Sequence, residues 1–531
     1  MPCPLNITIV QANFIVGDIK NNVDKIISIY QQITQTTNKI IPDLIVFSEL
    51  AITGYPAEDL YLQPYFQEIA FLELERLKTA ITKTAIIVGN IAPTNSKPVN
   101  KAYLIKDSKI IDIASKYHLP NYGVFDEQRY FTPEIYNQVF QLKGHNVGVL
   151  ICEDMWFLSR VDSLIKQGAK LVIVINASPF NIEKDKKRKA LAKNICQKYE
   201  IDFIYANQIG GQDELVFDGG SFAFNSKAEQ IANLSYFKEE IANIKWNESN
   251  RRFNSLSQTE AIYQALTLGL KDYVHKNKFK KVLLGLSGGI DSALTAAIAV
   301  DALGPDNVVA IMLPSKYTSK ESLIDAEKLA QTLNIELKNI PIEEITNSIR
   351  KTLSNSIDLE QGSITDQNIQ ARTRGLLLMS LSNQLGFLLL STGNKSENAV
   401  GYSTLYGDMC GGFNPLKDIY KTQVFELAKY RKLPKEIIEK APSAELCYDQ
   451  KDQDSLPEYI LLDKILFHLI EENLSKKEII AKGYDSVIVE KISYLLKRAE
   501  YKRRQSAPGP IISTRSLNLE RRYPITNSYK N

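Results

Sequence analysis

The chain has 531 residues, and at roughly 150 residues per domain this length allows two to four domains rather than a single core. Its 44% hydrophobic and 24% charged residues are typical of a soluble globular protein. The 64 basic and 61 acidic residues leave a net charge of only +3, which gives no argument for a nucleic-acid partner.

The cysteines and the apolar runs exclude further classes. The five cysteines are widely spaced and form no Cys-x-x-Cys pair, so they predict neither a disulfide framework nor a zinc site. The first residues show no basic region followed by an apolar core, and no apolar run approaches about 18 residues. We therefore expect no membrane segment and a cytoplasmic protein.

The first half of the chain alternates between short apolar runs and amphipathic stretches. The amphipathic stretches, residues 22–34, 66–82 and 186–198, are expected to form helices that cover a sheet. The apolar runs are rich in β-branched residues and suit strands buried on both faces; they are residues 7–10, 44–47, 85–89, 147–151, 171–175 and 203–206.

Reactive side chains follow two of these strands, at the end where an α/β sheet normally places its chemistry. Glu49 follows one strand, Cys152 follows another, and Lys116 lies between them in the sequence. A thiol becomes a strong nucleophile when a carboxylate accepts its proton, and a lysine stabilises both the thiolate and an oxyanion. Taken singly, each residue also fits an ordinary place in the core or on the surface.

The sequence around these three residues resembles the nitrilase (carbon–nitrogen hydrolase) family. The motifs are Glu-Leu-Ala-Ile-Thr-Gly-Tyr-Pro from Glu49, Lys-x-x-Leu-Pro-Asn-Tyr from Lys116 and Cys-Glu-Asp-Met-Trp from Cys152. The resemblance covers about residues 5–245 and implies an α-β-β-α sandwich. It also implies that Glu49 is the general base, Cys152 the nucleophile that forms a thioester and Lys116 the stabiliser of the tetrahedral intermediate, with Glu127 as a fourth polar residue.

Members of this family that are fused to synthetases use glutamine, so the resemblance implies a glutamine pocket. Matching the motifs assigns Tyr122, Phe125, Ser178 and Lys184 to that pocket. Lys184 opens a basic cluster, residues 184–189, and we expect most of its charges to lie on a solvated helix face.

The second half of the chain predicts a separate α/β domain. A polar stretch, residues 246–258, is the predicted linker between domains at residues 1–245 and 259–531. Beyond it the apolar spacing predicts a helix from Thr259. Strands and helices then alternate, which predicts a doubly wound parallel sheet with ligands beyond its carboxyl ends; the strands are residues 282–284, 308–313 and 387–390, and the helices residues 293–299, 322–333 and 367–383.

A glycine-rich turn joins the first of these strands to a helix. Such a turn leaves backbone N–H groups free at a helix N-terminus, where the helix dipole favours phosphate. A carboxylate beside a phosphate requires a cation such as Mg²⁺ to join the two. The alternative is a tight turn between packed elements. The loop consists of Gly285, Leu286, Ser287, Gly288, Gly289, Ile290, Asp291 and Ser292, and it lacks the Gly-Lys of a Walker A loop.

Ser-Gly-Gly-Ile-Asp-Ser in this loop resembles the pyrophosphate loop of the ATP pyrophosphatases, which have an adenine nucleotide alpha hydrolase-like fold and activate substrates as adenylates. Three further stretches, residues 368–375, 391–397 and 407–413, are similar to the NAD⁺ synthetase family. This resemblance implies contacts to ATP from Thr392, contacts to deamido-NAD⁺ from Asn368, Glu397 and Lys502, and an Mg²⁺ ion held by Asp291 and Glu397.

Together the resemblances imply a homo-oligomeric, ATP-dependent ligase that makes NAD⁺ from deamido-NAD⁺ and glutamine-derived ammonia, with small molecules as its partners. Two alternatives are another pyrophosphate-loop amidotransferase, similar to GMP or asparagine synthetase, and a non-catalytic nucleotide sensor. The nitrilase-type motifs and residues 368–375 count against the first alternative. Intact Glu49, Lys116 and Cys152 count against the second.

Overall fold

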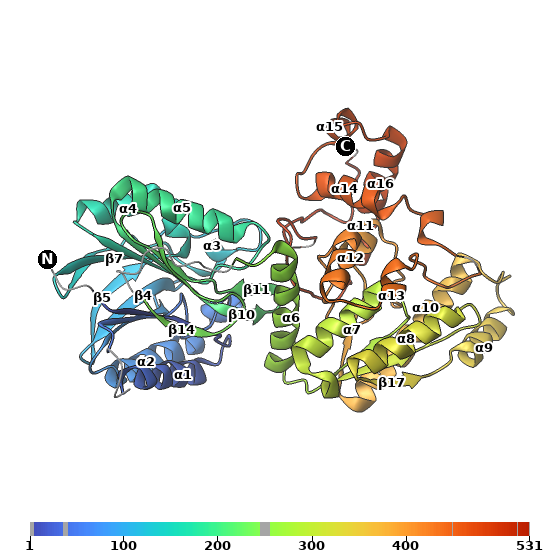
Figure 1. The fold of residues 1–531 in the computed structure, drawn as a ribbon, viewed down its shortest axis with the longest axis horizontal. Coiled ribbons are helices and arrows are strands. Elements are labelled where there is room, and N and C mark those ends of the chain that lie inside the picture. Colours follow the sequence, from blue (N-terminus) through green and yellow to red (C-terminus); the bar gives the residue numbers. More distant parts are fainter. Residues whose placement is uncertain (1–4, 36–40, 245–254, 449, 518, 530–531) are drawn as a thin grey trace. The chain divides into compact units, whose positions relative to one another are not determined.

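The computed structural model describes residues 5–35, 41–244, 255–448, 450–517 and 519–529 and divides into two compact units (Figure 1). Unit 1 comprises Met1–Gln212 and Val216–Ser255; unit 2 comprises Asp213–Leu215 and Leu256–Asn531. The predicted linker lies largely outside the described residues, so the domain bounds stay a prediction. Within the described ranges, no helix has the length and apolar character needed to cross a membrane.

Unit 1 is built on two six-stranded sheets. Their inner faces share one apolar core, to which Ile9 and Val46 contribute from one sheet and Val149 and Ile173 from the other. The first sheet has the order β14-β1-β2-β3-β4-β5, with β1 at Ile7–Gln11, β2 at Leu44–Val46, β3 at Ala85–Ala92, β4 at Val99–Lys106, β5 at Lys109–Ser115 and β14 at Glu240–Asn243. The second has the order β13-β12-β9-β8-β7-β6, with β6 at Val139–Leu142, β7 at His145–Ile151, β8 at Leu171–Asn176, β9 at Asp202–Asn207, β12 at Phe222–Phe224 and β13 at Gln230–Asn233.

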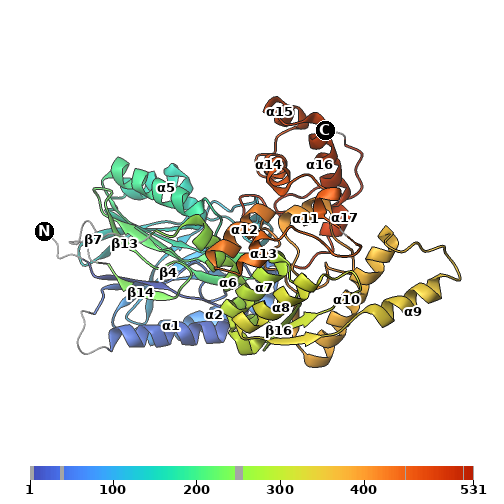
Figure 2. The ribbon, with the colours of Figure 1, turned by 45° about the vertical axis from the view of Figure 1, so that its right-hand side comes forward.

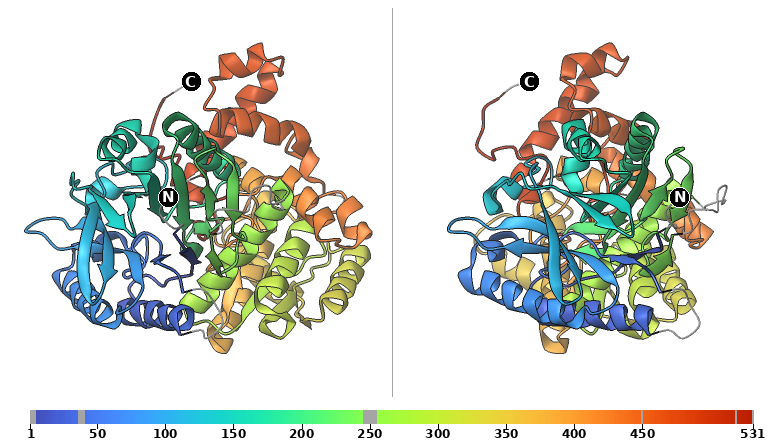
Figure 3. Two further views of the ribbon diagram at one scale, coloured as in Figure 1. Left: turned by 60° about the vertical axis from the view of Figure 1, so that its left-hand side comes forward. Right: turned by 90° about the vertical axis from the view of Figure 1, so that its left-hand side faces the viewer.

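Helices cover the outer face of each sheet. Helices α1 (Ile19–Thr34) and α2 (Pro64–Ala80) lie against the first sheet, and α4 (Leu158–Lys166) and α5 (Lys184–Tyr199) against the second (Figures 1 and 3). The resulting α-β-β-α layers confirm the predicted fold. The six predicted strands are all present. They form the parallel pairs β1–β2 and β2–β3 in the first sheet and β7–β8 and β8–β9 in the second.

The outer strands of both sheets pair antiparallel and were not predicted. A separate hairpin is formed by β10 (Ile209–Gln212) and β11 (Leu215–Asp218). Three short helices complete the unit: η1 (Glu58–Leu62), α3 (Glu127–Tyr130) and η2 (Cys152–Trp156).

Unit 2 contains a four-stranded parallel sheet of order β17-β16-β15-β18, confirming the predicted doubly wound domain (Figure 2). Because β16 and β18 flank β15 on opposite sides, the strand order reverses at β15, where such sheets bind ligands. The elements are α6 (Gln258–Lys276), β15 (Val282–Gly285), α7 (Ile290–Leu303), η3 (Pro305–Asn307), β16 (Val308–Met312), α8 (Lys320–Leu333), β17 (Glu336–Asn339), α9 (Glu343–Leu353), α10 (Ile364–Leu385) and β18 (Leu388–Leu390).

Most of the other regular structure in the described part of unit 2 is helical and was not predicted. Buried Val400, Leu466, Ile479 and Ile492 come from four of these helices and belong to one apolar cluster. The helices are α11 (Lys395–Val400), α12 (Lys421–Tyr430), α13 (Lys435–Glu439), η4 (Asp452–Asp454), α14 (Tyr459–Ile470), α15 (Lys476–Ala481), α16 (Ser486–Arg498) and α17 (Glu500–Arg503). The cluster supports α11, which follows the carboxyl end of β18.

We predict that Gly89→Ala destabilises unit 1 more than Gly148→Ala. A Cβ at Gly89 would lie 2.1 Å from the backbone nitrogen of Leu50, whereas one at Gly148 would meet the flexible end of the Leu164 side chain at 2.7 Å. Side chains yield more readily than backbone, so Gly89→Ala should lower the free energy of unfolding by about 1–3 kcal/mol. Urea unfolding of the full chain measures both variants; a larger loss for Gly148→Ala would contradict the packing described.

Candidate active sites

The backbone turn after β7 holds Cys152 in a fixed position. Cys152 begins the short helix η2 with φ of 43°, in the left-handed region that side-chain-bearing residues rarely adopt. Its side chain is buried. The turn therefore presents a single thiol at the carboxyl end of a central strand.

Lys116 places its ammonium between two carboxylates beside this thiol. Nζ donates to Glu49 Oε1 at 2.8 Å and to Glu127 Oε1 at 2.9 Å, and all three side chains are nearly inaccessible to solvent. Glu49 also accepts hydrogen bonds from the Asn100 amide and the Ala177 backbone, each at 2.8 Å. These contacts orient Glu49 independently of the lysine.

Burial and charge set the protonation of this cluster, which we call the thiol site (Glu49, Lys116, Glu127 and Cys152). Burial, reinforced by Glu49, raises the pKa of the Cys152 thiol well above its usual value. Burial alone would lower the pKa of Lys116, but Glu127 and Glu49 hold it above its ordinary value. Burial raises the pKa of Glu127 to about 7, opposed by Lys116. The resting site therefore holds a neutral thiol and a charged lysine.

Three residues assigned to the glutamine pocket, Tyr122, Phe125 and Lys184, contact aromatic or acidic side chains near the thiol site. The Tyr122 hydroxyl donates to both carboxylate oxygens of Glu153 at 3.0 Å, and its ring meets Phe125 edge-on with centroids 5.7 Å apart. Lys184 Nζ lies 5.2 Å from the centre of the Trp156 ring. Burial lowers the pKa of Lys184, opposed by Cys152 and Glu153, and Glu153 in turn helps to raise the pKa of Cys152; both charges therefore lie near the thiol.

Ser178 is buried, and Arg188 holds it in place. The Arg188 guanidinium donates to the Ser178 carbonyl at 2.8 Å and to its hydroxyl at 3.0 Å, and pairs with Asp218 at 2.8 Å. The basic cluster is thus divided: Lys187 is exposed, as predicted for most of its members, while Arg188 is fully buried. Arg188 was not distinguished from its charged neighbours in the sequence. Glu153 was likewise not predicted to belong to the site.

The glycine-rich loop of unit 2 folds as predicted between β15 and α7. Gly288 has φ of 77°, and a Cβ there would lie 2.3 Å from the carbonyl oxygen of Ser322. The Ser292 hydroxyl closes the loop by accepting from Ser287 N at 3.2 Å and donating to Gly289 O at 3.0 Å. Asp291 lies in the first turn of α7. The loop therefore leads directly into the N-terminus of α7, where the helix dipole favours an anion.

The stretch after β18 begins beside this loop because β15 and β18 are parallel neighbours. Thr392 follows the strand, and Asn394 caps α11 by accepting from Glu397 N at 3.0 Å. The Asn394 amide also donates to Asp291 Oδ1 at 2.9 Å. The structure thus brings residues 391–397 against the glycine-rich loop.

The other residues assigned to deamido-NAD⁺ meet at the segment that follows α11. Asn368 accepts from the Thr404 hydroxyl at 2.9 Å. Lys502 donates to the carbonyls of Gly401 and Ser403 at 2.9 and 2.6 Å. Both therefore contact the same short segment, residues 401–404, from different helices.

Asp291 and Glu397, the predicted Mg²⁺ ligands, both contact the ammonium of Lys421 in the structure. Its ammonium donates to Asp291 Oδ2, and to Glu397 Oε1 at 3.1 Å. Burial raises the pKa of Glu397 to about 7, opposed by Lys421. Lys421 was not predicted from the sequence. Among the residues that the structure describes, no group of three or more His, Cys, Asp or Glu is placed to hold a metal; two carboxylates fit Mg²⁺, which takes its other ligands from water and phosphate.

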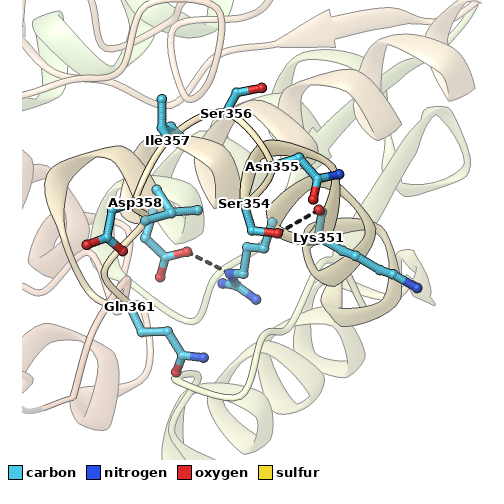
Figure 4. Close-up of a pocket in the computed structure, with 10 residues that line it drawn as sticks. Lys351, Ser354, Asn355, Ser356, Ile357, Asp358 and Gln361 are labelled. Atoms are coloured by element: carbon cyan, nitrogen blue, oxygen red, sulfur yellow. Dashed lines mark hydrogen bonds and ion pairs between the residues drawn. The ribbon is translucent and has the colours of Figure 1, made fainter.

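A further pocket of about 560 Å³ lies where α9 ends and α10 begins (Figure 4). Arg350 lines it but is already paired with Asp366 at 2.7 Å. None of the residues assigned to substrates borders this pocket, so the predicted chemistry does not use it. The other lining residues are Lys351, Ser354, Asn355, Ser356, Ile357, Asp358, Leu359 and Gln361.

Comparison with known proteins identifies relatives of both units. A carbon-nitrogen hydrolase family model matches residues 6–248, and an NAD synthase family model matches residues 262–506. The chain is 44% identical to the glutamine-dependent NAD(+) synthetase of Acinetobacter baylyi over 97% of each protein, and 39% identical to that of Aquifex aeolicus over 99% of this chain and 100% of the relative. The solved glutamine-dependent NAD⁺ synthetase of Acinetobacter baumannii, in complex with ADP, matches with a TM-score of 0.78 and 41% identity over 98% of both chains.

We predict that Glu127→Gln weakens the pH dependence of stability. The pKa of Glu127 is about 7 in the folded protein against an ordinary value of 4.5, so the folded chain binds an extra proton between these values and its free energy of unfolding falls as the pH rises through this window. A glutamine side chain stays neutral and removes this loss. The melting temperature of the variant, relative to wild type, should rise by a few degrees between pH 5 and pH 8. A pH-independent difference would contradict the raised pKa.

Proposed function

The chain belongs to the family of glutamine-dependent NAD(+) synthetases, and on this premise we propose how its residues divide the reaction. The chain is a ligase that forms a carbon–nitrogen bond with the glutamine amide as nitrogen donor. In our proposal, unit 1 releases ammonia from glutamine and unit 2 uses ATP to join that ammonia to deamido-NAD⁺. The homo-oligomeric state and the cytoplasmic location remain predictions of the sequence analysis.

The thiol site performs the first half of the reaction. Glu49 accepts the proton of Cys152 as the sulfur attacks the amide carbon of glutamine, and Lys116 stabilises the oxyanion that forms. Ammonia leaves with a proton returned through Glu49, and water then hydrolyses the thioester to glutamate. The observation that supports this assignment is the buried Lys116, which pairs with Glu49 and Glu127 beside the only thiol at a strand end of the described part of this unit.

Two opposite charges near the thiol suit the two charges of free glutamine. The α-carboxylate of the substrate is negative and its α-ammonium positive, so a selective pocket needs a cation and an anion. Lys184 supplies the cation and Glu153, fixed by the Tyr122 hydroxyl, supplies the anion. Ser178, fixed by Arg188, forms a further wall of the pocket.

The carboxyl end of the parallel sheet performs the second half. The backbone N–H of Gly288 and the N-terminus of α7 bind the phosphates of ATP, and Thr392 contacts the nucleotide. The nicotinate carboxylate of deamido-NAD⁺, held through Asn368 and Lys502, attacks the α-phosphate and pyrophosphate leaves. Ammonia then displaces AMP and forms the nicotinamide. When Mg²⁺ is bound by Asp291 and Glu397, its positive charge offsets the negative charge of the phosphates.

Substitution of the proposed nucleophile tests the division of labour. We predict that Cys152→Ala lowers glutamine-dependent NAD⁺ synthesis by roughly three orders of magnitude or more and leaves ammonia-dependent synthesis unchanged, whereas Asp291→Ala abolishes both. Cys196→Ala, which changes another buried cysteine of unit 1, is the matched control and should retain both activities. Glutamine use at the wild-type rate by Cys152→Ala would show that another residue is the nucleophile.

A substrate analogue tests the assignment of Glu153. Glutaramate is glutamine without its α-amino group, so it lacks the charge that Glu153 is proposed to bind. We expect Glu153→Gln to raise the KM for glutamine about 30-fold and to leave hydrolysis of glutaramate unchanged. Glu183→Gln, which alters an exposed carboxylate beside Lys184, should change neither. Equal losses for both substrates would indicate a structural role for Glu153 instead.

A further inference from the structure

Lys421 occupies a position that its local backbone does not favour. It is the first residue of α12, where the helix dipole disfavours positive charge, and its side chain is only 2% exposed. Its ammonium is nevertheless held by two carboxylates and lies 5.2 Å from the centre of the Tyr459 ring. The carboxylates and the ring, rather than the helix, therefore determine where this charge lies.

Different elements hold the carboxylates around this lysine. Asp291 lies in the first turn of α7 and Glu397 in the first turn of α11, where the helix dipoles favour negative charge. The Asn394 amide donates to the Asp291 carboxylate, and its oxygen accepts from the Glu397 backbone N–H, so Asn394 links the two first turns. The carboxylates are thus preorganised for a cation, whichever cation is present.

The backbone of Lys421 is anchored separately from its side chain. Its N–H donates to the Ser396 hydroxyl at 2.8 Å, and that hydroxyl donates to Asp463. Asp463 also accepts from the Thr422 N–H at 2.8 Å. The position of the first turn of α12 therefore does not depend on the ion pairs of the Lys421 side chain.

Asp291 and Glu397 cannot hold the Lys421 ammonium and a divalent ion through the same oxygens at once. Lys421 donates to Asp291 Oδ2 and Glu397 Oε1, and the other Asp291 oxygen accepts from Asn394. A divalent ion held by this pair would therefore compete with Lys421 for Asp291 Oδ2. An ammonium that shares both oxygens with a divalent cation would lie within a few ångströms of it, and like charges at that distance in a partly buried site repel strongly.

We propose, on the basis of the function proposed above, that Lys421 is the resident cation of the nucleotide-free site and keeps free Mg²⁺ out until ATP arrives. The side chains of Asp291 and Glu397 are 19% and 17% exposed, so a ligand from solvent can reach them. When the triphosphate binds, its negative charge offers the ammonium a second partner, and the carboxylates become free for the metal. The divalent ion then enters with the nucleotide rather than ahead of it.

Direct Mn²⁺ binding to the full chain without nucleotide tests this proposal. We expect Lys421→Met to bind Mn²⁺ about tenfold or more tightly than wild type in a titration followed by electron paramagnetic resonance. Lys421→Arg retains the positive charge and should show no gain. Adding Asp291→Asn to Lys421→Met should remove the gain. Lys440→Met removes one positive charge elsewhere in unit 2 and should bind Mn²⁺ as wild type does.

Unchanged Mn²⁺ affinity in Lys421→Met would overturn the proposal, and so would a gain that survives Asp291→Asn. If the methionine variant does not fold, Lys421→Gln, which can still hydrogen-bond both carboxylates, replaces it with the same expected gain. No substrate is present in this titration, so its outcome is independent of NAD⁺ formation. A failure of the proposed function would be seen in the product assays with glutamine and ammonia instead.

Discussion

Each of the two centres depends on a lysine whose ammonium is removed from water and held between two carboxylates. Lys116 is held in this way in unit 1 and Lys421 in unit 2. A buried ammonium is costly unless it is paired, and two carboxylates around one ammonium leave an excess negative charge. Together with burial, this excess raises the pKa of Glu127 and of Glu397 to about 7. Each centre therefore contains a carboxyl group poised between its charged and neutral forms near neutral pH.

The two lysines differ in how firmly their surroundings hold them. Lys116 is fully enclosed, and one of its carboxylate partners is also bonded to Asn100 and to the Ala177 backbone. It can therefore remain in place while the thiol reacts. The partners of Lys421 are partly exposed beside a loop suited to phosphate, so an incoming anion can compete for its ammonium. A lysine between two carboxylates is thus a permanent positive charge in unit 1, whereas in unit 2 an anion can draw the lysine away from its partners.

The sequence was sufficient where local patterns determine local structure. Buried parallel strands are continuous apolar runs, and the glycine-rich strand-to-helix turn is a contiguous motif that resembles a known loop, so both were predicted. The antiparallel outer strands, such as β5 with its mixture of buried and exposed residues, lack that signal. Lys421, Glu153 and Arg188 could not be identified because their roles arise from partners far away in the chain. A charge held by residues 24 and 130 positions away, as Lys421 is, has no local signature.

In the proposed reaction, one chain takes nitrogen from glutamine at a thiol site and places it in NAD⁺ at an ATP site. Glutamine labelled with ¹⁵N in its amide, supplied with deamido-NAD⁺, ATP and Mg²⁺, follows that nitrogen when the products are resolved by mass spectrometry. We expect NAD⁺ that carries the ¹⁵N in its nicotinamide amide, formed together with equal amounts of AMP and pyrophosphate. Unlabelled NAD⁺, or labelled NAD⁺ formed with ADP and phosphate in place of AMP and pyrophosphate, would contradict the proposed reaction.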